Sequence, residues 1–194
     1  MVRVFLLDNV DSFTYNLAQG LEQLGAVVQV VRASSALTDA IAAFVPTHLV
    51  LSPGPLRPAD HPAIFTLLER FAGRLPMLGV CLGMQAINEY CGGGIRRDTH
   101  PMHGKTSAVI HDGHSLFADV PTPFSAARYH SLRCDPLGQE LHATAWTSDR
   151  RIVMALQHTT KPLFGLQFHP ESYLTPDGLR ILRNFLAVGG NDRI

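Results

Sequence analysis

The sequence predicts an α/β fold with an open, mostly parallel sheet, helices on both faces and a small antiparallel extension. Three observations support this fold, which we expect to form a single domain over residues 1–194. Short apolar runs alternate with segments of helical periodicity in the first half of the chain. Shorter strand-like runs separated by turns replace this alternation after Cys91. The length of 194 residues, with 46% hydrophobic side chains, suits one sizeable core.

The first half of the chain contains four predicted strands, each followed by a helical segment. Residues 2–7 form a short apolar run of the kind that is buried in parallel sheets. Asp11 and Ser12 can cap a helix over residues 13–24, in which apolar residues recur at helical spacing before Gly25 ends the run. The elements that follow are strand 27–31, helix 37–44, strand 48–51, helix 64–71 and strand 77–80.

The second half begins after a turn at Gly92-Gly93-Gly94 and has a different pattern. Its short strands are separated by turns, which predicts an antiparallel or mixed extension of the sheet. Thr175 and Pro176 are predicted to begin the last helix, because threonine is a good N-cap and proline suits the first helical position. The predicted strands of this half are 107–110, 124–129, 141–146, 152–156 and 164–168.

Composition and charge exclude several classes of protein. Sixteen basic side chains balance sixteen acidic ones and the pI is about 7.2, which argues against nucleic acid or a membrane surface as the main partner. The apolar run at the N-terminus is too short for a signal peptide, and no stretch approaches the length of a membrane span. Three widely spaced cysteines do not form a disulfide framework. We therefore expect a cytoplasmic globular protein.

Two local motifs are better explained as turns or solvated loops than as ligand sites. Gly104-Lys105-Thr106 resembles the end of a phosphate-binding loop, but that motif requires glycine at position 99, which is Thr. Histidines with the spacing of metal ligands lie in loops without a nearby cysteine, so we expect no metal there. These histidines are His100, His103, His111 and His114.

The most informative stretch is Gly79-Val80-Cys81-Leu82-Gly83, where an apolar strand meets a helix. This G-x-C-x-G pattern is the thiol form of a nucleophile elbow, whose glycines allow a strained residue on a sharp strand-to-helix turn. Such a turn exposes the sulfur at the carboxyl end of the sheet and at a helix N-terminus, which favours a thiolate. It also directs the Leu82 N–H at a developing oxyanion. Taken alone, the stretch also fits a buried core cysteine between two packing glycines.

A second stretch, Phe168-His169-Pro170-Glu171, strengthens the catalytic interpretation. In an extended backbone residues i and i+2 project to the same side, so Glu171 can reach the ring of His169. A cysteine nucleophile needs a base within hydrogen-bond reach, and that base needs a third group to orient it. We therefore interpret Cys81, His169 and Glu171 as a candidate triad that only the fold could assemble.

With these motifs, the sequence resembles the class I glutamine amidotransferases that use a Cys-His-Glu triad. Within this family it is most similar to the glutaminase components of anthranilate synthase and 4-amino-4-deoxychorismate synthase. The resemblance covers nearly the whole chain, in the family's order. The stretches that carry it are residues 8–16, 52–58, 78–87, 103–107, 128–132 and 165–172.

The resemblance implies roles for the residues at matching positions. Cys81 would attack the carboxamide of L-glutamine, His169 would pass a proton to the departing ammonia, and Glu171 would orient His169. A γ-glutamyl thioester would form and be hydrolysed without a cofactor or metal, and ammonia would travel to a chorismate-binding synthase subunit. Oxyanion N–H groups would come from Gly54 and Leu82. The residues implied to surround the glutamine and the oxyanion are Gly54, Pro55, Leu56, Leu82, Gln85, Ser131 and Leu132.

Leu56 and Met84 depart from the family's pattern, which commonly has glycine and histidine at these positions. Glycine would allow a positive φ at position 56 at little cost, whereas a leucine there is strained. Because Pro53, Pro55 and Pro58 fix φ at negative values around it, we predict a negative φ at Leu56 as well. The alternative is a strained Leu56 that leaves the oxyanion hole poorly formed until the partner docks. We interpret Met84 as a packing change on the elbow helix.

Two alternatives stay open beside the glutaminase interpretation. One is a different hydrolase of the same fold that acts on γ-glutamyl compounds, against which Gln85 and Ser131 argue. The other is a non-catalytic regulatory or scaffold subunit, which only Leu56 and Met84 suggest. The sequence does not distinguish a tryptophan pathway from a folate pathway for the product.

Overall fold

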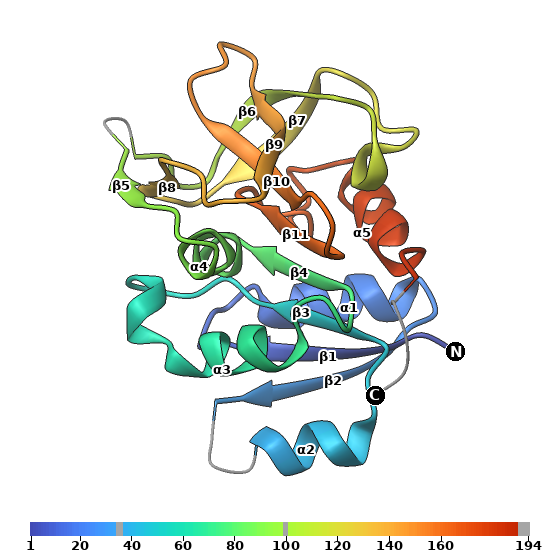
Figure 1. Cartoon of the computed structure of the whole chain (residues 1–194). Helices are drawn as coiled ribbons and strands as arrows, with labels where there is room; N and C mark the ends of the chain where they lie inside the picture. The colour runs from blue at the N-terminus through green and yellow to red at the C-terminus, as the bar shows by residue number, and fades with distance from the viewer. Residues whose placement is uncertain (34–36, 99–100, 190–194) are drawn as a thin grey trace.

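The structure is a computed structural model that describes residues 1–33, 37–98 and 101–189. Within these residues, nine strands form one open sheet in the order β2-β1-β3-β4-β11-β10-β9-β6-β7 (Figure 1). The first five in this order are parallel to one another, as the alternating pattern predicts. These five are β2 (Val27–Arg32), β1 (Arg3–Asp8), β3 (His48–Leu51), β4 (Met77–Val80) and β11 (Leu163–Leu166).

The antiparallel extension continues the same sheet beyond β11. It has four strands, and each pairs antiparallel with its neighbour, so the sheet as a whole is mixed. β11 itself pairs parallel with β4, which brings the segment after β11 beside the segment after β4. The four strands are β10 (Val153–His158), β9 (Leu141–Thr147), β6 (Lys105–His111) and β7 (Phe124–Arg128).

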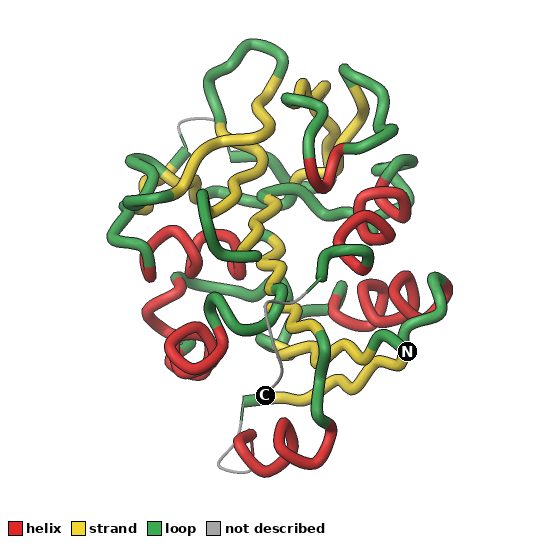
Figure 2. The backbone as a smooth tube through the Cα atoms, turned by 45° about the vertical axis from the view of Figure 1, so that its right-hand side comes forward, coloured by secondary structure: helices red, strands yellow, loops and turns green. Residues whose placement is uncertain are grey.

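Helices cover both faces of the parallel half of the sheet (Figure 2). Along β1, Val4 and Leu6 face one side, where they pack with residues of α1 (Thr14–Gln23) and α5 (Gly178–Leu186). Phe5 and Leu7 face the other side of the sheet, where they pack with residues of three helices. Among the helices of the described residues, none is long and apolar enough to cross a bilayer. The three helices of the second face are α2 (Leu37–Phe44), α3 (Pro62–Phe71) and α4 (Leu82–Tyr90).

A short second sheet lies beside α4 and was not predicted. It pairs β5 (Ile95–Arg97) antiparallel with β8 (Leu132–Cys134), three residues each. Two single-turn 3-10 helices were likewise not predicted, η1 (Pro58–Asp60) and η2 (Ser115–Phe117). Elements of three residues are too short to show a hydrophobic period.

The predicted start of the last helix is wrong. α5 begins at Gly178, after an N-terminal flank at Asp177, instead of at Thr175-Pro176. The Thr175 hydroxyl is not free to cap a helix, because it donates to the His169 carbonyl (2.8 Å) and accepts from the Ala127 N–H (3.0 Å). Thr175 therefore fixes the segment that carries His169.

Two polar side chains fasten the loop after β1 to its neighbours. One oxygen of the buried Asp8 carboxylate accepts hydrogen bonds from the Thr14 hydroxyl (2.8 Å) and the Val10 N–H (3.0 Å). Burial alone would raise the pKa of Asp8, but the hydrogen bonds from Arg32 and Thr14 lower it. The Asn9 amide donates to the Ser52 carbonyl at 3.0 Å, which ties the β1 loop to the β3 loop.

Candidate active site

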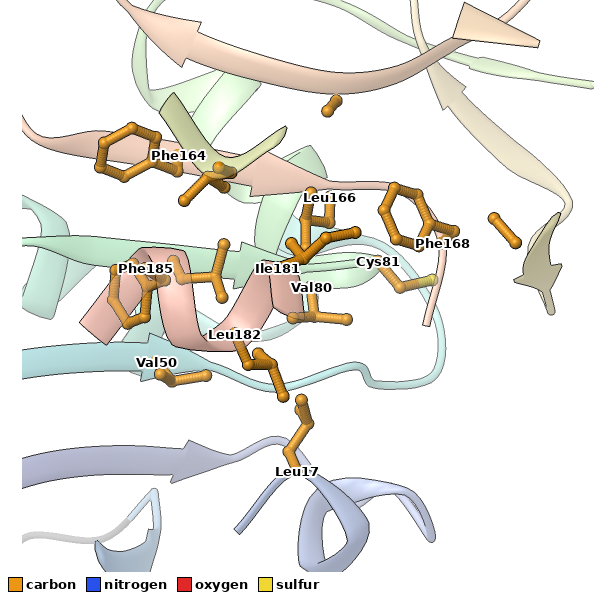
Figure 3. Packing of buried hydrophobic residues seen from close by; sticks show 14 of the residues in the cluster. Leu17, Val50, Val80, Cys81, Phe164, Leu166, Phe168, Ile181, Leu182 and Phe185 are labelled. Atoms are coloured by element: carbon orange, nitrogen blue, oxygen red, sulfur yellow. The ribbon is translucent and has the colours of Figure 1, made fainter. Parts of the chain in front are cut away.

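Cys81 occupies the predicted turn between β4 and α4. Its φ of 52° and ψ of −100° are strained for a residue with a side chain, as the elbow requires. A Cβ on Gly79 would lie 2.3 Å from the Gly83 backbone, and one on Gly83 would lie 2.4 Å from the Leu51 carbonyl. Both glycines are therefore needed for strand and helix to approach. Figure 3 shows the sulfur beyond the end of β4, beside Phe168.

His169 and Glu171 meet in the way that their spacing predicts. His169 Nδ1 lies 2.6 Å from Glu171 Oε1, and both side chains are buried. Because a carboxylate only accepts, Nδ1 carries the proton of this hydrogen bond. The His169 backbone N–H donates to the Ala127 carbonyl at 3.0 Å, which fixes the segment against β7.

The second ring nitrogen of His169 is turned toward the cysteine. Nε2 is buried and makes no hydrogen bond of ordinary geometry within the described residues. Burial alone would lower the pKa of His169, but the interactions with Cys81 and Glu171 raise it to about 10. Cys81 is therefore near enough to stabilise a protonated imidazole, the form that can donate a proton.

Two aromatic rings hold the imidazole of His169 in place. The rings of Phe13 and Tyr129 each lie 5.0 Å from it, in edge-to-face arrangements. They also contact each other at 4.8 Å. The hydrophobic contact restricts rotation of the ring, so this is a role for Phe13 and Tyr129 that their sequence positions alone did not indicate.

A cavity of about 170 Å³ collects the predicted substrate residues around Cys81. It lies where β3 and β4 end, as ligand sites do in open α/β sheets. A larger hollow of about 740 Å³ between α1 and residues 170–179 does not include Cys81, so size does not identify the site. The small cavity is lined by Gly54, Pro55, Leu56, Cys81, Leu82, Gln85, Tyr129, His130, Ser131 and Leu132.

Gly54 and Leu82 lie side by side at this cavity. A Cβ on Gly54 would lie 2.4 Å from Leu82 Cδ2 and 2.9 Å from Asn9 Cβ, so the loop approaches α4 this closely only with glycine there. Leu82 is the first residue of α4, and its N–H has no acceptor within the helix. The arrangement leaves helix N–H groups available to a negative charge near the Cys81 sulfur.

The prediction for Leu56 is wrong: its φ is 66°. The proline before it explains the error. A proline followed by a residue with positive φ is typical of a type II turn, which favours glycine at the second position. Proline fixes its own φ and not that of the next residue. The His61 ring also hydrogen-bonds the Pro55 carbonyl (2.8 Å), and the Leu56 side chain is 73% exposed, so solvent accommodates it.

A buried polar network lies behind the cavity wall. The Arg128 guanidinium pairs with Asp98 at 3.3 Å and donates from Nε to His130 Nε2 at 3.0 Å. His130 Nδ1 donates to the Leu132 carbonyl at 2.9 Å. Burial and the charge of Arg128 lower the pKa of His130 to about 4, so its imidazole is neutral at pH 7. The network fixes the backbone of residues 130–132 at the cavity.

Comparison with known proteins decides the family. The sequence model of the family described as "Glutamine amidotransferase class-I" matches residues 5–188. The chain is also 43% identical over 196 residues to anthranilate synthase component 2 of Pseudomonas aeruginosa, covering 98% of each chain. The chain belongs to the class I glutamine amidotransferases. Two further relatives are 43% identical: the aminodeoxychorismate/anthranilate synthase component 2 of Bacillus subtilis (95% of this chain, 96% of the relative) and the aminodeoxychorismate synthase component 2 of Escherichia coli (94% and 98%).

Solved structures support the fold of this amidotransferase. A glutamine amidotransferase of Thermotoga maritima superposes with a TM-score of 0.71 at 16% identity, covering 95% of this chain and 96% of the other. A Thermoplasma acidophilum protein described as part of a GMP synthase gives a TM-score of 0.85 at 24% identity, with 96% and 92% covered. At these identities the likeness concerns the fold alone.

Two of the four loop histidines of the amidotransferase pack against aromatic rings. The His111 ring stacks on Phe117 at 4.7 Å, and His103 contacts the Tyr129 ring at 5.3 Å. His100 lies outside the described residues, among which no three metal-ligating side chains gather. Met84 is fully buried against the second face of the sheet, in agreement with a packing role.

Sequence reasoning missed one buried polar residue beside the cysteine of the amidotransferase. The Gln167 side chain is fully buried, and its Nε2 lies 3.7 Å from the Cys81 sulfur. Its position two residues before His169 on an extended segment was a usable signal, because residues i and i+2 project to the same side.

Proposed function

We propose that the chain is the glutaminase component of a chorismate-aminating synthase, on a single domain over residues 1–194. It would hydrolyse L-glutamine to glutamate and deliver ammonia to a separate synthase subunit. The observation that carries the proposal is the cavity that joins Cys81 to Gly54, Leu82 and Gln85, close to the hydrogen-bonded pair of His169 and Glu171. The three similar relatives, all named as components 2 of such synthases, support the same assignment.

The first chemical step is attack of the Cys81 sulfur on the carboxamide carbon of glutamine. The negative charge that develops on the carbonyl oxygen is stabilised by the N–H groups of Gly54 and Leu82. Protonated His169 donates its proton to the departing nitrogen, so ammonia leaves and a γ-glutamyl thioester remains. The raised pKa of His169, about 10, keeps this proton in place at pH 7.

The second step returns the residues to their starting state. Neutral His169 takes a proton from water, the hydroxide attacks the thioester carbon, and the C–S bond breaks to give glutamate and the Cys81 thiolate. Glu171 holds the imidazole orientation through both proton transfers by its 2.6 Å hydrogen bond. No cofactor takes part in either step.

The end of the cavity away from Cys81 would hold the α-amino and α-carboxylate groups of glutamine. Gln85 uses its Nε2 for the Leu132 carbonyl (3.2 Å) and Gln167 Oε1 (3.3 Å). Its own Oε1 then offers an acceptor that suits an α-ammonium group. Ser131 and Leu132 line the same end, held by the His130 network. Leu56 would complete this end from the β3 loop.

Substitution of the nucleophile tests the mechanism. In the complex with its synthase subunit, Cys81→Ala should abolish amination driven by glutamine and leave amination driven by ammonium salts unchanged, because only the first needs the thioester. Both products, anthranilate and 4-amino-4-deoxychorismate, would be assayed with the respective synthase subunits. Cys134→Ala, at a buried cysteine outside the cavity, is the control. Normal glutamine-driven amination by Cys81→Ala would refute the mechanism.

Glutaminase assays of the chain, alone and with the synthase subunit, test whether activity depends on the partner. The same assays test which class of substrate is hydrolysed. Glutaminase turnover should be low alone and rise when the synthase subunit is added, since uncoupled turnover wastes glutamine. Hydrolysis of γ-glutamyl peptides in preference to glutamine would instead indicate the alternative hydrolase. Failure of a glutamine-analogue electrophile to label Cys81 would indicate a non-catalytic subunit. The three free cysteines fit a protein of the reducing cytoplasmic compartment.

A further inference from the structure

Gln167 is a buried amide whose two ends both have partners in the site. Its Nε2 lies 3.7 Å from the Cys81 sulfur, a hydrogen-bond length that suits the large radius of sulfur. Its Oε1 lies 3.3 Å from Gln85 Nε2. The side chain thus bridges the nucleophile and a residue at the opposite end of the cavity.

The neighbours of Gln167 determine which way its amide faces. Gln85 Nε2 also donates to the Leu132 carbonyl, which is only an acceptor. The nitrogen of Gln85 must therefore face both partners, and the atom that Gln167 presents to it must be the oxygen. The N–H of Gln167 is left to face the sulfur as a donor.

The backbone gives this donor little freedom to move. The Gln167 N–H donates to the Met154 carbonyl at 2.9 Å, and the Cys81 N–H donates to the Leu166 carbonyl at 2.7 Å. Two residues further on, the His169 N–H is bonded to Ala127 at 3.0 Å. These main-chain hydrogen bonds fix the backbone positions of Cys81, Gln167 and His169.

We propose that Gln167 is a positioning residue that orients and stabilises the Cys81 thiolate and links it to Gln85. A buried negative charge is costly unless hydrogen bonds satisfy it, and hydrogen bonds to charged groups are stronger than those between neutral groups. The imidazole of His169 supports the sulfur from one side, and Gln167 supplies a second, neutral donor to the thiolate. This inference rests on the proposed function, because it takes Cys81 as the nucleophile.

The test measures the reactivity of Cys81 without glutamine. Full-length Gln167→Met keeps the length of the side chain and removes its donor, so iodoacetamide should alkylate Cys81 about tenfold more slowly at pH 7, as followed by mass spectrometry of its peptide. With glutamine and the synthase subunit, kcat should fall by about tenfold while KM changes by less than about twofold. The lost interaction acts at the sulfur, and Gln85 keeps its hydrogen bond to the Leu132 carbonyl. Gln167→Asn, which retains a buried amide but withdraws its N–H by one methylene, should give the same losses.

Gln157→Met is the matched control. Gln157 lies half-buried on the neighbouring strand β10, and its side chain makes no hydrogen bond within the described residues. Its alkylation rate and kcat should equal those of the wild type. Folded Gln167→Met or Gln167→Asn with wild-type alkylation of Cys81 would overturn the positioning role. If the variants show the slower alkylation but the wild type hydrolyses no glutamine even with the synthase subunit present, the proposed function is overturned instead.

Discussion

Leu56 combines a bulky side chain with a backbone conformation that favours glycine. Its φ of 66° resembles that of Val10, at 64°, on the loop that Asn9 ties to the β3 loop. Both side chains are exposed, by 73% and 64%. Such a conformation costs about 1–3 kcal/mol, so it persists only because the surrounding loop fixes it. Leu56 and Cys81, which both have a positive φ, line the same cavity.

The strain at Leu56 predicts a difference between two substitutions. Leu56→Gly should raise the free energy of unfolding by about 1 kcal/mol relative to Leu56→Ala, because only glycine adopts the positive φ freely. The side chain is mostly solvated, so its loss costs little in either variant. Urea titrations of both variants measure the difference. Equal stabilities of the glycine and alanine variants would show that the loop is not strained at this residue.

Among single residues, sequence reasoning pointed to those that lie in a local motif. It missed those whose conformation or contacts depend on residues distant in the sequence. Cys81 and His169 lie in local motifs, and the structure places the predicted substrate residues in the lining of the cavity at Cys81. The conformation of Leu56 depends on the turn type of the whole loop, which its prolines alone did not reveal. Gln167 has a role only because β11 lies parallel beside β4, and that pairing is a property of the sheet.

Among the elements, the β4–α4 elbow has a strict packing requirement. A Cβ on Gly83, near the start of α4, would lie 2.4 Å from the Leu51 carbonyl oxygen on β3. A Cβ on Gly20, within α1, would lie 3.4 Å from Leu179 and Leu182, which is ordinary contact at its close limit. The two helical glycines therefore differ in what surrounds them.

This difference predicts opposite effects for the same substitution in two helices. Gly83→Ala should lower the free energy of unfolding by about 1–3 kcal/mol, because the added methyl group overlaps fixed backbone. Gly20→Ala should be neutral or stabilise by up to about 1 kcal/mol, because alanine has the better helix propensity. Chemical denaturation of both variants measures the contrast. Equal stability of the two variants would contradict the packing requirement at the elbow.

The bounds of α2, β3 and β4 match the predicted ranges, because turns or breaker residues flank each of these apolar runs. The errors concern elements whose limits depend on distant contacts. Thr175 and Pro176 have the local chemistry of a helix start, but Thr175 bonds to Ala127 and His169 instead. β5 and β8 pair where α4 and the network of Arg128 bring distant segments together. No local sequence pattern therefore predicts these two strands.

Over the whole molecule, two buried histidines give stability with opposite dependence on pH. The pKa of His130 is lowered to about 4, so its contribution is present above the unfolded pKa of about 6.5 and is lost as the pH falls toward 4. The pKa of His169 is raised to about 10, so its contribution is present below about 6.5 and is lost as the pH rises toward 10. The fold is therefore expected to be most stable near neutral pH, where both histidines keep the protonation state that their partners favour.

The acid side of this dependence is testable at His130. Between pH 7 and pH 4.5 the free energy of unfolding of the wild type should fall by about 2 kcal/mol because of His130. The unfolded chain binds a proton at this histidine in that range, whereas the buried imidazole beside Arg128 stays mostly neutral. His130→Gln should lower the free energy of unfolding at pH 7, because it removes hydrogen bonds. Between pH 7 and pH 4.5, however, the variant should lose about 2 kcal/mol less of this free energy than the wild type. Urea titrations at the two pH values measure both losses, with His114→Gln, at an exposed histidine, as the control that should retain the wild-type slope. Equal losses in His130→Gln and the wild type would show that the network of Arg128, Asp98 and His130 does not set the acid stability of the fold.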